Sequence, residues 1–378
     1  METRSLVAAP PGELQTPAWW QLYRPPLWLP GGNAQTLWAA TLARRHAAGQ
    51  APGWRRERWQ TPDGDFVDVD HLAAPADDAA PSLAGGAASS PHLRHGGGAA
   101  AAASRPHLVL FHGLEGSSAS QYAQAFAVAA RQRGWGFSVP HFRGCSGELN
   151  LAPRAYHSGD FEEIGWLLAR LSERHGAPVL AVGISLGGNA LLRWAEEAGE
   201  SAARHAAAVA AVCSPIDLAA AGRAIDRGFN WLVYSRMFLA TMKPKALAKL
   251  RQHPGLFDEA RLRAARTLYE FDDVFTAPLH GFRDTPDYWA RASAKPHLGL
   301  IRIPALVLNA RNDPFVPAAS LPLASPDSNA PAQRLSQHVT LWQPAHGGHV
   351  GFPVGPFPGQ VSAMPQAVCD WLVRPALL

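Results

Sequence analysis

From residue 106 onward, short apolar runs alternate with longer stretches in which apolar residues recur every three or four positions. A short run that is apolar throughout is typical of a buried parallel strand, and the longer spacing is typical of an amphipathic helix. The alternation therefore predicts an α/β fold, with a mostly parallel central sheet and helices on both faces. The expected strands are HLVLFHG, GFSVPHF, PVLAVGIS, AAVAAVCSP, IPALVLNAR and HVTLWQPA, and the expected helices include SQYAQAFAVAARQRG, DFEEIGWLLARLSERHG, NALLRWAEEAG and MPQAVCDWLVRPAL.

Three other segments have different patterns. RRERWQ and DFVDVDHLA flank a TPDG turn with alternating apolar and polar positions, which predicts an antiparallel hairpin with one solvent-exposed face. Residues 216–296 contain long helical stretches and no clear strand, so we expect a helical cap there. Residues 74–105 consist mostly of Ala, Gly, Ser and Pro without periodicity, which predicts a disordered insertion.

The first 53 residues form an arm rich in proline and tryptophan. One helix is expected in it, capped by Asn33 and ending near Arg45. Its tryptophans are expected to pack on the body of the domain, although contact with a membrane surface is an open alternative. The predicted organisation is this arm, residues 1–53, followed by one α/β domain over residues 54–378.

The composition narrows the class of protein. Of 378 residues, 47% are hydrophobic and 17% charged, which is typical of a globular chain. There is no apolar run of about 18 residues and no secretory signal pattern, so we expect neither a transmembrane helix nor secretion. The three cysteines lie far apart and fit neither zinc binding nor a redox pair, which favours a reducing cytoplasm. The net charge of +4 is dispersed, so nucleic acid is not an expected partner.

The sequence GISLGG, residues 183–188, follows an apolar strand and precedes a helix. A strand, then G-x-S-x-G, then a helix is the arrangement of a nucleophile elbow, in which Gly183 and Gly187 allow close packing and the serine hydroxyl is exposed. Ser185 is therefore the candidate nucleophile. No Lys-Ser or Lys-Thr pair follows these glycines, which excludes a phosphate-binding loop of the P-loop type.

A serine nucleophile needs a base and an acid that orients the base. Asp313 follows the strand PALVLNA and His349 follows the strand VTLWQ, and loops after the carboxyl ends of strands carry the working groups of such sheets. The order Ser185, Asp313, His349 is the order of an α/β-hydrolase triad. Asp217 is an alternative acid, and His346 and His338 are alternative bases. The HGGH spacing is weak evidence for a metal, so neither a metal nor a cofactor is predicted.

The negative charge that develops on the substrate oxygen during the reaction also needs hydrogen-bond donors. FHGLEGS follows the first strand of the alternating region, so the N–H of Leu114 is expected to face the N–H of Leu186, the residue after the nucleophile. These two backbone groups are the predicted oxyanion hole. His112, in the same motif, is expected to be a structural hydrogen-bonding residue and not a second base.

Several motifs identify a family resemblance. FHGLEGS, HFRGCSGE, YHSGD, GISLGGN, EFDD, HGF, NARNDPF and HGGHVGF occur in an order and spacing that closely resemble the YheT-like branch of the α/β-hydrolases, with its plant embryogenesis-associated and animal lipid-hydrolase relatives. The resemblance extends from about Leu29 to the C-terminus. Two insertions depart from it, residues 74–105 and the stretch SLPLASPDSNAPAQRLSQ, and neither removes a candidate catalytic residue.

The resemblance implies a Ser–Asp–His hydrolase that acts on carboxylic esters or acylglycerols of short to medium chain length, and carries the triad onto Ser185, Asp313 and His349. Trp231, Tyr234, Met237 and Phe238 in the cap are expected either to roof an acyl pocket or to pack within the cap. An acyltransferase with the same triad and a non-catalytic ligand-binding protein remain alternatives. The acyl-chain length, the head group and the oligomeric state cannot be predicted from the sequence.

Overall fold

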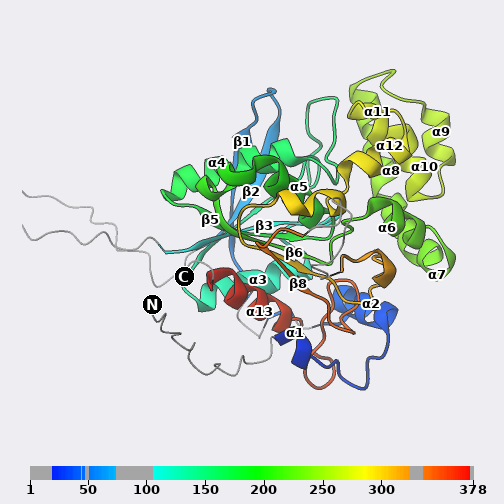
Figure 1. Cartoon of the computed structure of the whole chain (residues 1–378). Helices are drawn as coiled ribbons and strands as arrows, with labels where there is room; N and C mark the ends of the chain where they lie inside the picture. Colours follow the sequence, from blue (N-terminus) through cyan, green and yellow to red (C-terminus); the bar gives the residue numbers. More distant parts are fainter. Residues whose placement is uncertain (1–18, 44, 47–50, 74–104, 324–334, 375–378) are drawn as a thin grey trace, which may run out of the picture.

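A computed structural model describes residues 19–43, 45–46, 51–73, 105–323 and 335–374 (Figure 1). Its core is an eight-stranded sheet in the order β1-β2-β4-β3-β5-β6-β7-β8. The first two strands form an antiparallel hairpin, β2 pairs antiparallel with β4, and every other pairing is parallel. The strands are β1 Trp54–Gln60, β2 Phe66–Leu72, β3 His107–Phe111, β4 Gly136–Pro140, β5 Val179–Ile184, β6 Ala206–Val212, β7 Ala305–Leu308 and β8 Val339–Trp342.

Helices cover both faces of the sheet, as the alternating pattern predicts. In Figure 1, α4 Phe161–His175 and α5 Leu186–Ala198 lie on one face, and α3 Gln121–Gln132 and α13 Ala363–Val373 lie on the other. Side chains of a strand point alternately to the two faces. On β3, for example, Leu108 and Leu110 belong to the apolar cluster that includes α3 and α13, whereas Val109 and Phe111 belong to the cluster that includes α4 and α5.

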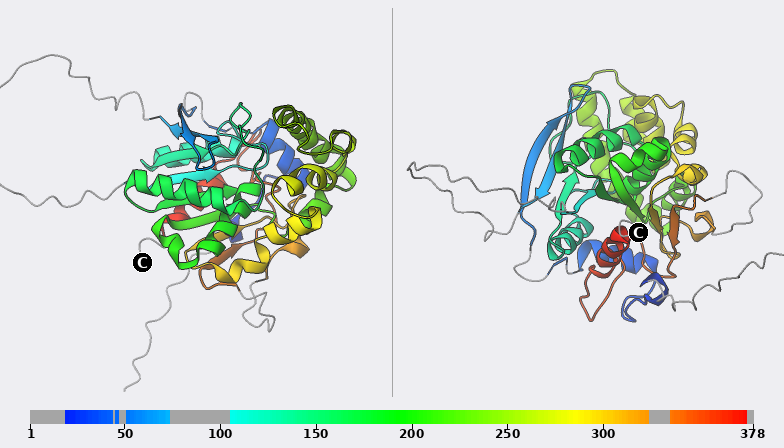
Figure 2. Two further views of the ribbon diagram at one scale, coloured as in Figure 1. Left: turned by 90° about the horizontal axis from the view of Figure 1, so that it is seen from above. Right: turned by 60° about the vertical axis from the view of Figure 1, so that its left-hand side comes forward.

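The prediction that one face of the hairpin is exposed to solvent is wrong. Asp68 and Asp70 of β2 are 2% and 3% exposed. In the sheet, β2 lies between β1 and β4 (Figure 2). The segments after β3 and β4 cover its second face, since Ser118 donates to Asp70 (2.6 Å) and His141 lies 2.9 Å from the same carboxylate. The two aspartates are thereby enclosed. Their charges are compensated by β1, since Arg58 donates two hydrogen bonds to Asp68 (2.8 and 3.0 Å) and Arg56 two to Asp70 (2.7 and 2.9 Å).

Between β6 and β7 the chain forms helices and turns and no strand. This segment projects beyond the end of the sheet in Figure 1, and we refer to its helical part, residues 218–292, as the cap. It comprises α6 Leu218–Ile225, α7 Gly228–Asn230, a π-helical turn Trp231–Ser235, α8 Arg236–Gln252, α9 Glu259–Ala264, α10 Leu268–Phe271, a second π-helical turn Asp272–Thr276, α11 Ala277–Leu279 and α12 Thr285–Ala292.

The N-terminal arm packs on the domain through α1 Trp19–Leu22 and α2 Gly32–Thr41. Trp38 is only 3% exposed and donates to the carbonyl of Pro358 (2.6 Å). The prediction that Asn33 is the N-cap residue of this helix is wrong. The N-cap residue of α2 is Gly31, whose φ of 79° suits glycine. The side chain of Asn33 instead accepts a hydrogen bond from Tyr234 of the cap (3.0 Å).

The remaining described helical segments are short 3₁₀ turns: Gly199–Arg204, Lys295–Leu300 and Ala318–Ser320. No helix among the described residues is long and apolar enough to span a bilayer. The segment expected to be disordered, and most of the insertion between Asp313 and His349, lie outside the described residues.

Candidate active site

Ser185 lies on the sharp turn between β5 and α5, at a φ of 52° that is unusual for a residue other than glycine. Its N–H donates to Val212 on β6 (2.8 Å), which fixes the turn on the sheet. A Cβ atom on Gly183 would lie 2.4 Å from the Cα of Gly188, and one on Gly187 would lie 2.5 Å from the carbonyl oxygen of His112. The glycines are therefore required by close backbone approach, as the motif predicts.

The loops after β7 and β8 bring an aspartate and a histidine to this serine. His349 Nε2 lies 3.0 Å from Ser185 Oγ, and His349 Nδ1 lies 2.8 Å from Asp313 Oδ2. Since a carboxylate only accepts hydrogen bonds, Nδ1 carries the proton and Nε2 is left to accept from the serine hydroxyl. The three side chains predicted from sequence thus form one continuous hydrogen-bonded chain.

The Asp313 carboxylate is held on its other side by the backbone of its own loop. Its Oδ1 accepts from the N–H groups of Phe315 (2.8 Å) and Val316 (3.2 Å). The side chain is completely buried. The ring of Phe315 also packs against the imidazole of His349, with centroids 4.3 Å apart. These contacts orient both the acid and the base.

The N-terminal helix α2 supports the loop that bears His349, and this is the part of the site that the sequence did not reveal. Thr36 Oγ1 accepts from the N–H of His349 (2.8 Å), and Gln35 Oε1 accepts from the N–H of Gly347 (3.0 Å). Asn312, beside the acid, donates to the same Gln35 oxygen (3.1 Å) and accepts from Gly348 N–H (2.9 Å). The only sequence signal is the adjacent polar pair Gln35–Thr36 in the middle of the helix GNAQTLWAAT.

Two backbone N–H groups are available beside the serine. A Cβ atom on Gly113 would lie 3.2 Å from Cβ of Ser185, so the turn after β3 packs against the nucleophile. Within the described part of the chain, neither the N–H of Leu114 nor that of Leu186 has an acceptor. Leu186 is also the first residue of α5, where the helix dipole favours negative charge. Both predicted oxyanion donors are therefore unengaged; Leu186 directly follows Ser185, and the turn that carries Leu114 packs against it.

His112 has the structural role expected of it. Its Nδ1 is 2.8 Å from the carbonyl oxygen of Gly113, and its Nε2 accepts from the N–H of Phe142 (3.0 Å). The side chain is fully buried, and this burial lowers the pKa of the imidazole to about 3. His112 stays neutral and fixes the turn that carries Leu114.

The alternative acid and bases do not join the site. Asp217 caps α6 by accepting from the N–H of Ala220 (3.0 Å) and pairs with Lys295 (3.5 Å). His338 lies at the start of β8, at the opposite end of the strand from the loop that bears His349. His346 is exposed, and no hydrogen bond links it to Ser185.

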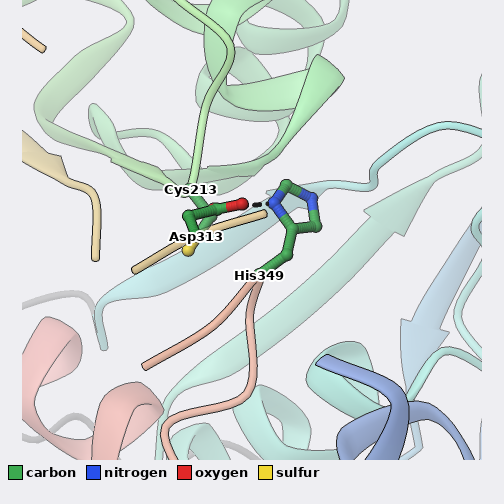
Figure 3. Close-up of side chains that lie close together, drawn as sticks. All are labelled: Cys213, Asp313 and His349. Carbon is green, nitrogen blue, oxygen red and sulfur yellow. Dashed lines mark hydrogen bonds and ion pairs between the residues drawn. The ribbon is translucent and has the colours of Figure 1, made fainter. Parts of the chain in front are cut away.

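Cys213, Asp313 and His349 form a cluster whose donor atoms lie within 4.8 Å of one another (Figure 3). Burial, and then the nearby Asp313 carboxylate, raises the pKa of the Cys213 thiol well above its ordinary value, so the sulfur keeps its proton. Metal ions bind the thiolate. Asp313 also has both oxygens engaged, so the donor set suits proton transfer better than metal binding.

A cavity of about 70 Å³ borders the oxyanion residues. Its floor includes Leu114 and Leu186, and α8 and the second π-helical turn of the cap contribute the other side. The lining does not include Trp231, Tyr234, Met237 or Phe238, which were expected either to roof an acyl pocket or to pack within the cap. Tyr234 and Phe238 pack instead around Phe315, with centroids 4.6 and 6.3 Å away. The cap side is formed by Met242, Lys245, Ala246, Lys249, Phe271, Asp272, Phe275, Thr276 and Tyr288.

Comparisons with known proteins agree with this architecture. The chain is 38% identical over 324 residues to the Escherichia coli (strain K12) protein named "Putative esterase YheT", covering 85% of this chain and 84% of that one. It is 30% identical over 267 residues to Phospholipase ABHD3 of Mus musculus, covering 69% and 62% of the two chains. It is 27% identical over 261 residues to Monoacylglycerol lipase of Saccharomyces cerevisiae, covering 66% and 55%. The chain thus spans less than two thirds of the latter two relatives.

These matches confirm the YheT-like resemblance read from the motifs. Residues 106–356, which contain β3 to β8, the cap and the Ser185–His349–Asp313 cluster, match the family model described as the alpha/beta hydrolase fold. The chain belongs to the alpha/beta hydrolase fold family.

Proposed function

We propose that this protein is a carboxylic ester hydrolase that works through an acyl-enzyme on Ser185. The observation that carries the proposal is the hydrogen-bonded chain from Asp313 through His349 to Ser185, at 2.8 and 3.0 Å. It ends at a serine on a strained turn beside two unengaged backbone donors. An esterase, a phospholipase and a lipase among the names of its relatives support the same class of reaction.

The proposed reaction has two halves. Ser185 Oγ attacks the ester carbonyl carbon while His349 Nε2 takes the hydroxyl proton, and the N–H groups of Leu114 and Leu186 stabilise the oxyanion. The carbon–oxygen bond to the leaving alcohol then breaks, and His349 gives its proton to that oxygen. Water attacks the acyl-serine with His349 as base, which releases the carboxylic acid and restores the serine.

The proposed substrates are short- to medium-chain acyl esters or acylglycerols. A cavity of about 70 Å³ borders Leu114 and Leu186. Apolar side chains from both the domain and the cap line it, including Leu149, Met242, Phe271 and Phe275. Such walls favour an acyl chain, and the relatives named as lipid hydrolases support this choice.

Hydrolysis of nitrophenyl esters of graded acyl length by the wild type and Ser185→Ala tests this proposal. We expect the variant to lose at least ~10⁴-fold in turnover, as triad serines do. Ser201→Ala, in the turn after α5, is the matched control and should retain full activity. Wild-type rates in Ser185→Ala would refute the proposed nucleophile. Product analysis with a competing alcohol would identify an acyltransferase, and an inactive wild type would indicate a binding protein.

A further inference from the structure

The turn that carries Leu114 contains a residue in an unfavourable conformation. Glu115, which directly follows Leu114, has a φ of 57°. Left-handed backbone is rare for residues other than glycine and persists only where surrounding contacts hold it. A turn bond from the N–H of Gly116 to the carbonyl of Gly113 (2.9 Å) is one such contact. The position of the Leu114 N–H therefore depends on what holds Glu115.

One side of Glu115 is held by Tyr156. The N–H of Glu115 donates to Tyr156 Oη (3.0 Å), and this hydroxyl in turn donates to Glu115 Oε1 (2.9 Å). Tyr156 is itself stacked on Phe142, with centroids 5.3 Å apart and the rings nearly parallel at 9°. These contacts come from the domain and fix the backbone and the side chain of Glu115 together.

The other side of Glu115 is held by the cap. Lys245 Nζ on α8 lies 3.0 Å from Glu115 Oε1 and 2.9 Å from Oε2. Lys245, Glu115 and Leu114 all line the cavity that borders the oxyanion donors. The Glu115 side chain is 11% exposed and that of Lys245 39%. The ion pair thus links the cap directly to the oxyanion turn across the cavity.

We propose that Lys245 is a positioning residue that holds the Leu114 oxyanion donor in place through Glu115, so that α8 and the oxyanion site form one unit. This inference rests on the proposed ester hydrolysis. An ion pair whose lysine is 39% exposed contributes little to global stability. Its effect on the position of one donor matters more, because small misplacements near the reacting atoms cost rate.

Steady-state kinetics of Lys245→Met and Lys245→Arg test the inference on a nitrophenyl ester. We expect Lys245→Met to lower kcat roughly tenfold with KM changed less than about twofold, since a donor used mainly in the transition state is displaced. Lys245→Arg keeps a positive charge that can pair with the Glu115 carboxylate and should stay within about threefold of the wild type. Lys243→Met is the control, because this lysine of the same helix donates outside the cavity, to the carbonyl of Arg263 (2.8 Å).

A double-mutant cycle shows whether the two residues act together. Glu115→Gln should lower kcat in the same way, and the double variant Glu115→Gln/Lys245→Met should be no slower than the slower single variant. Additive losses would overturn the proposal. So would an unchanged kcat in Lys245→Met, or a loss in Lys245→Arg as large as that in Lys245→Met.

The two proposals fail in different ways. If the wild type hydrolyses esters in a Ser185-dependent manner and Lys245→Met does so equally fast, the positioning role is wrong and the hydrolase assignment stands. If the wild type shows no Ser185-dependent hydrolysis, both are wrong.

Discussion

At the scale of single residues, the carboxylate of Asp313 divides its two oxygens between two tasks. One oxygen accepts from backbone N–H groups of its own loop and the other from His349. A carboxylate in this position stabilises the imidazolium that forms when the serine proton moves and fixes which nitrogen carries the proton. An amide can keep its oxygen on the backbone N–H groups, but it then presents its NH₂ donor to His349 and can neither stabilise the imidazolium nor fix the tautomer.

We therefore predict that Asp313→Asn lowers kcat by roughly 10³- to 10⁴-fold, because the wrong histidine tautomer then faces Ser185. Asp217→Asn, at the acid that sequence alone left as the alternative, should retain nearly full activity. Both values come from the same ester assay. A large loss in Asp217→Asn with little loss in Asp313→Asn would show that the acid is misassigned.

The sequence predicted that Ser185, Asp313 and His349 would lie together. Each of them follows an apolar strand, and parallel strands end at one edge of a sheet. It could not locate Gln35 or Thr36. The hydrogen bond from His349 to Thr36 joins residues 313 positions apart, and no local pattern marks a contact of that separation. Cys213 was likewise visible only as an unpaired cysteine, and its place beside Asp313 depends on the register of β6 and β7.

At the scale of elements, α2 supports the histidine loop. Gln35 is fully buried, and its side-chain oxygen accepts from both Gly347 and Asn312. Gln35→Ala leaves the partly buried amide of Asn312 and the buried N–H of Gly347 without this acceptor, at a cost of about 1–3 kcal/mol for the buried donor. We predict a lower Tm and a kcat reduced roughly tenfold, since His349 is less well positioned.

Thr41→Ala is the control for this element. Thr41 ends α2, and its hydroxyl makes an exposed hydrogen bond to Leu37. Thermal unfolding and ester kinetics measured on both variants separate the two sites. Equal behaviour of Gln35→Ala and Thr41→Ala would show that α2 does not support the active-site loop.

The β1–β2 turn anchors a second loop, through Asp65. Its carboxylate accepts from Asn150 Nδ2 (2.7 Å) and from the N–H groups of Leu151 (2.7 Å) and Ala152 (3.1 Å). Burial alone would raise the pKa of Asp65, but these hydrogen bonds outweigh it and lower the pKa to about 2, from an ordinary 3.8. The depressed pKa means that the folded state favours the charged form.

The stabilisation from Asp65 is therefore complete above pH 3.8 and is lost as the pH falls towards 2. We predict that the free energy of unfolding of the wild type decreases over this range. The free energy of unfolding of Asp65→Asn should decrease less steeply with falling pH, although this variant is less stable than the wild type at pH 7. Urea unfolding at several pH values measures both. The same pH slope in the two proteins would contradict this role.

At the scale of the whole molecule, the order of buried strands and flanking helices was predictable, because parallel strands covered on both faces are apolar throughout. How the cap folds onto the domain was not. Of the side chains for which a roofing role and packing were both open, Tyr234 and Phe238 pack around Phe315, since helical spacing shows which residues share a face and not what that face contacts. The burial of the hairpin face was missed for a related reason. Alternating aspartates look the same in the sequence whether they face solvent or pair with arginines inside the protein.

The cavity between cap and domain should determine which acyl-chain lengths the enzyme prefers. Ala246 of α8 lines it, whereas Ala240 on the same helix lines an outer groove. We predict that Ala246→Phe lowers kcat/KM for longer acyl chains by tenfold or more relative to acetate, because the ring occupies space needed by the chain. Ala240→Phe should leave this ratio unchanged. A graded ester series measures the ratio, and an unchanged profile in Ala246→Phe would place the acyl chain elsewhere.

Covalent trapping is the most direct test of the central claim that Ser185 becomes acylated. After incubation with a fluorophosphonate, intact mass and peptide mapping should find one adduct per chain, on the peptide that contains Ser185. The adduct should be absent in Ser185→Ala and should form slowly in Asp313→Asn. An adduct on a different residue, or ester turnover by a wild type that forms no adduct, would contradict the account.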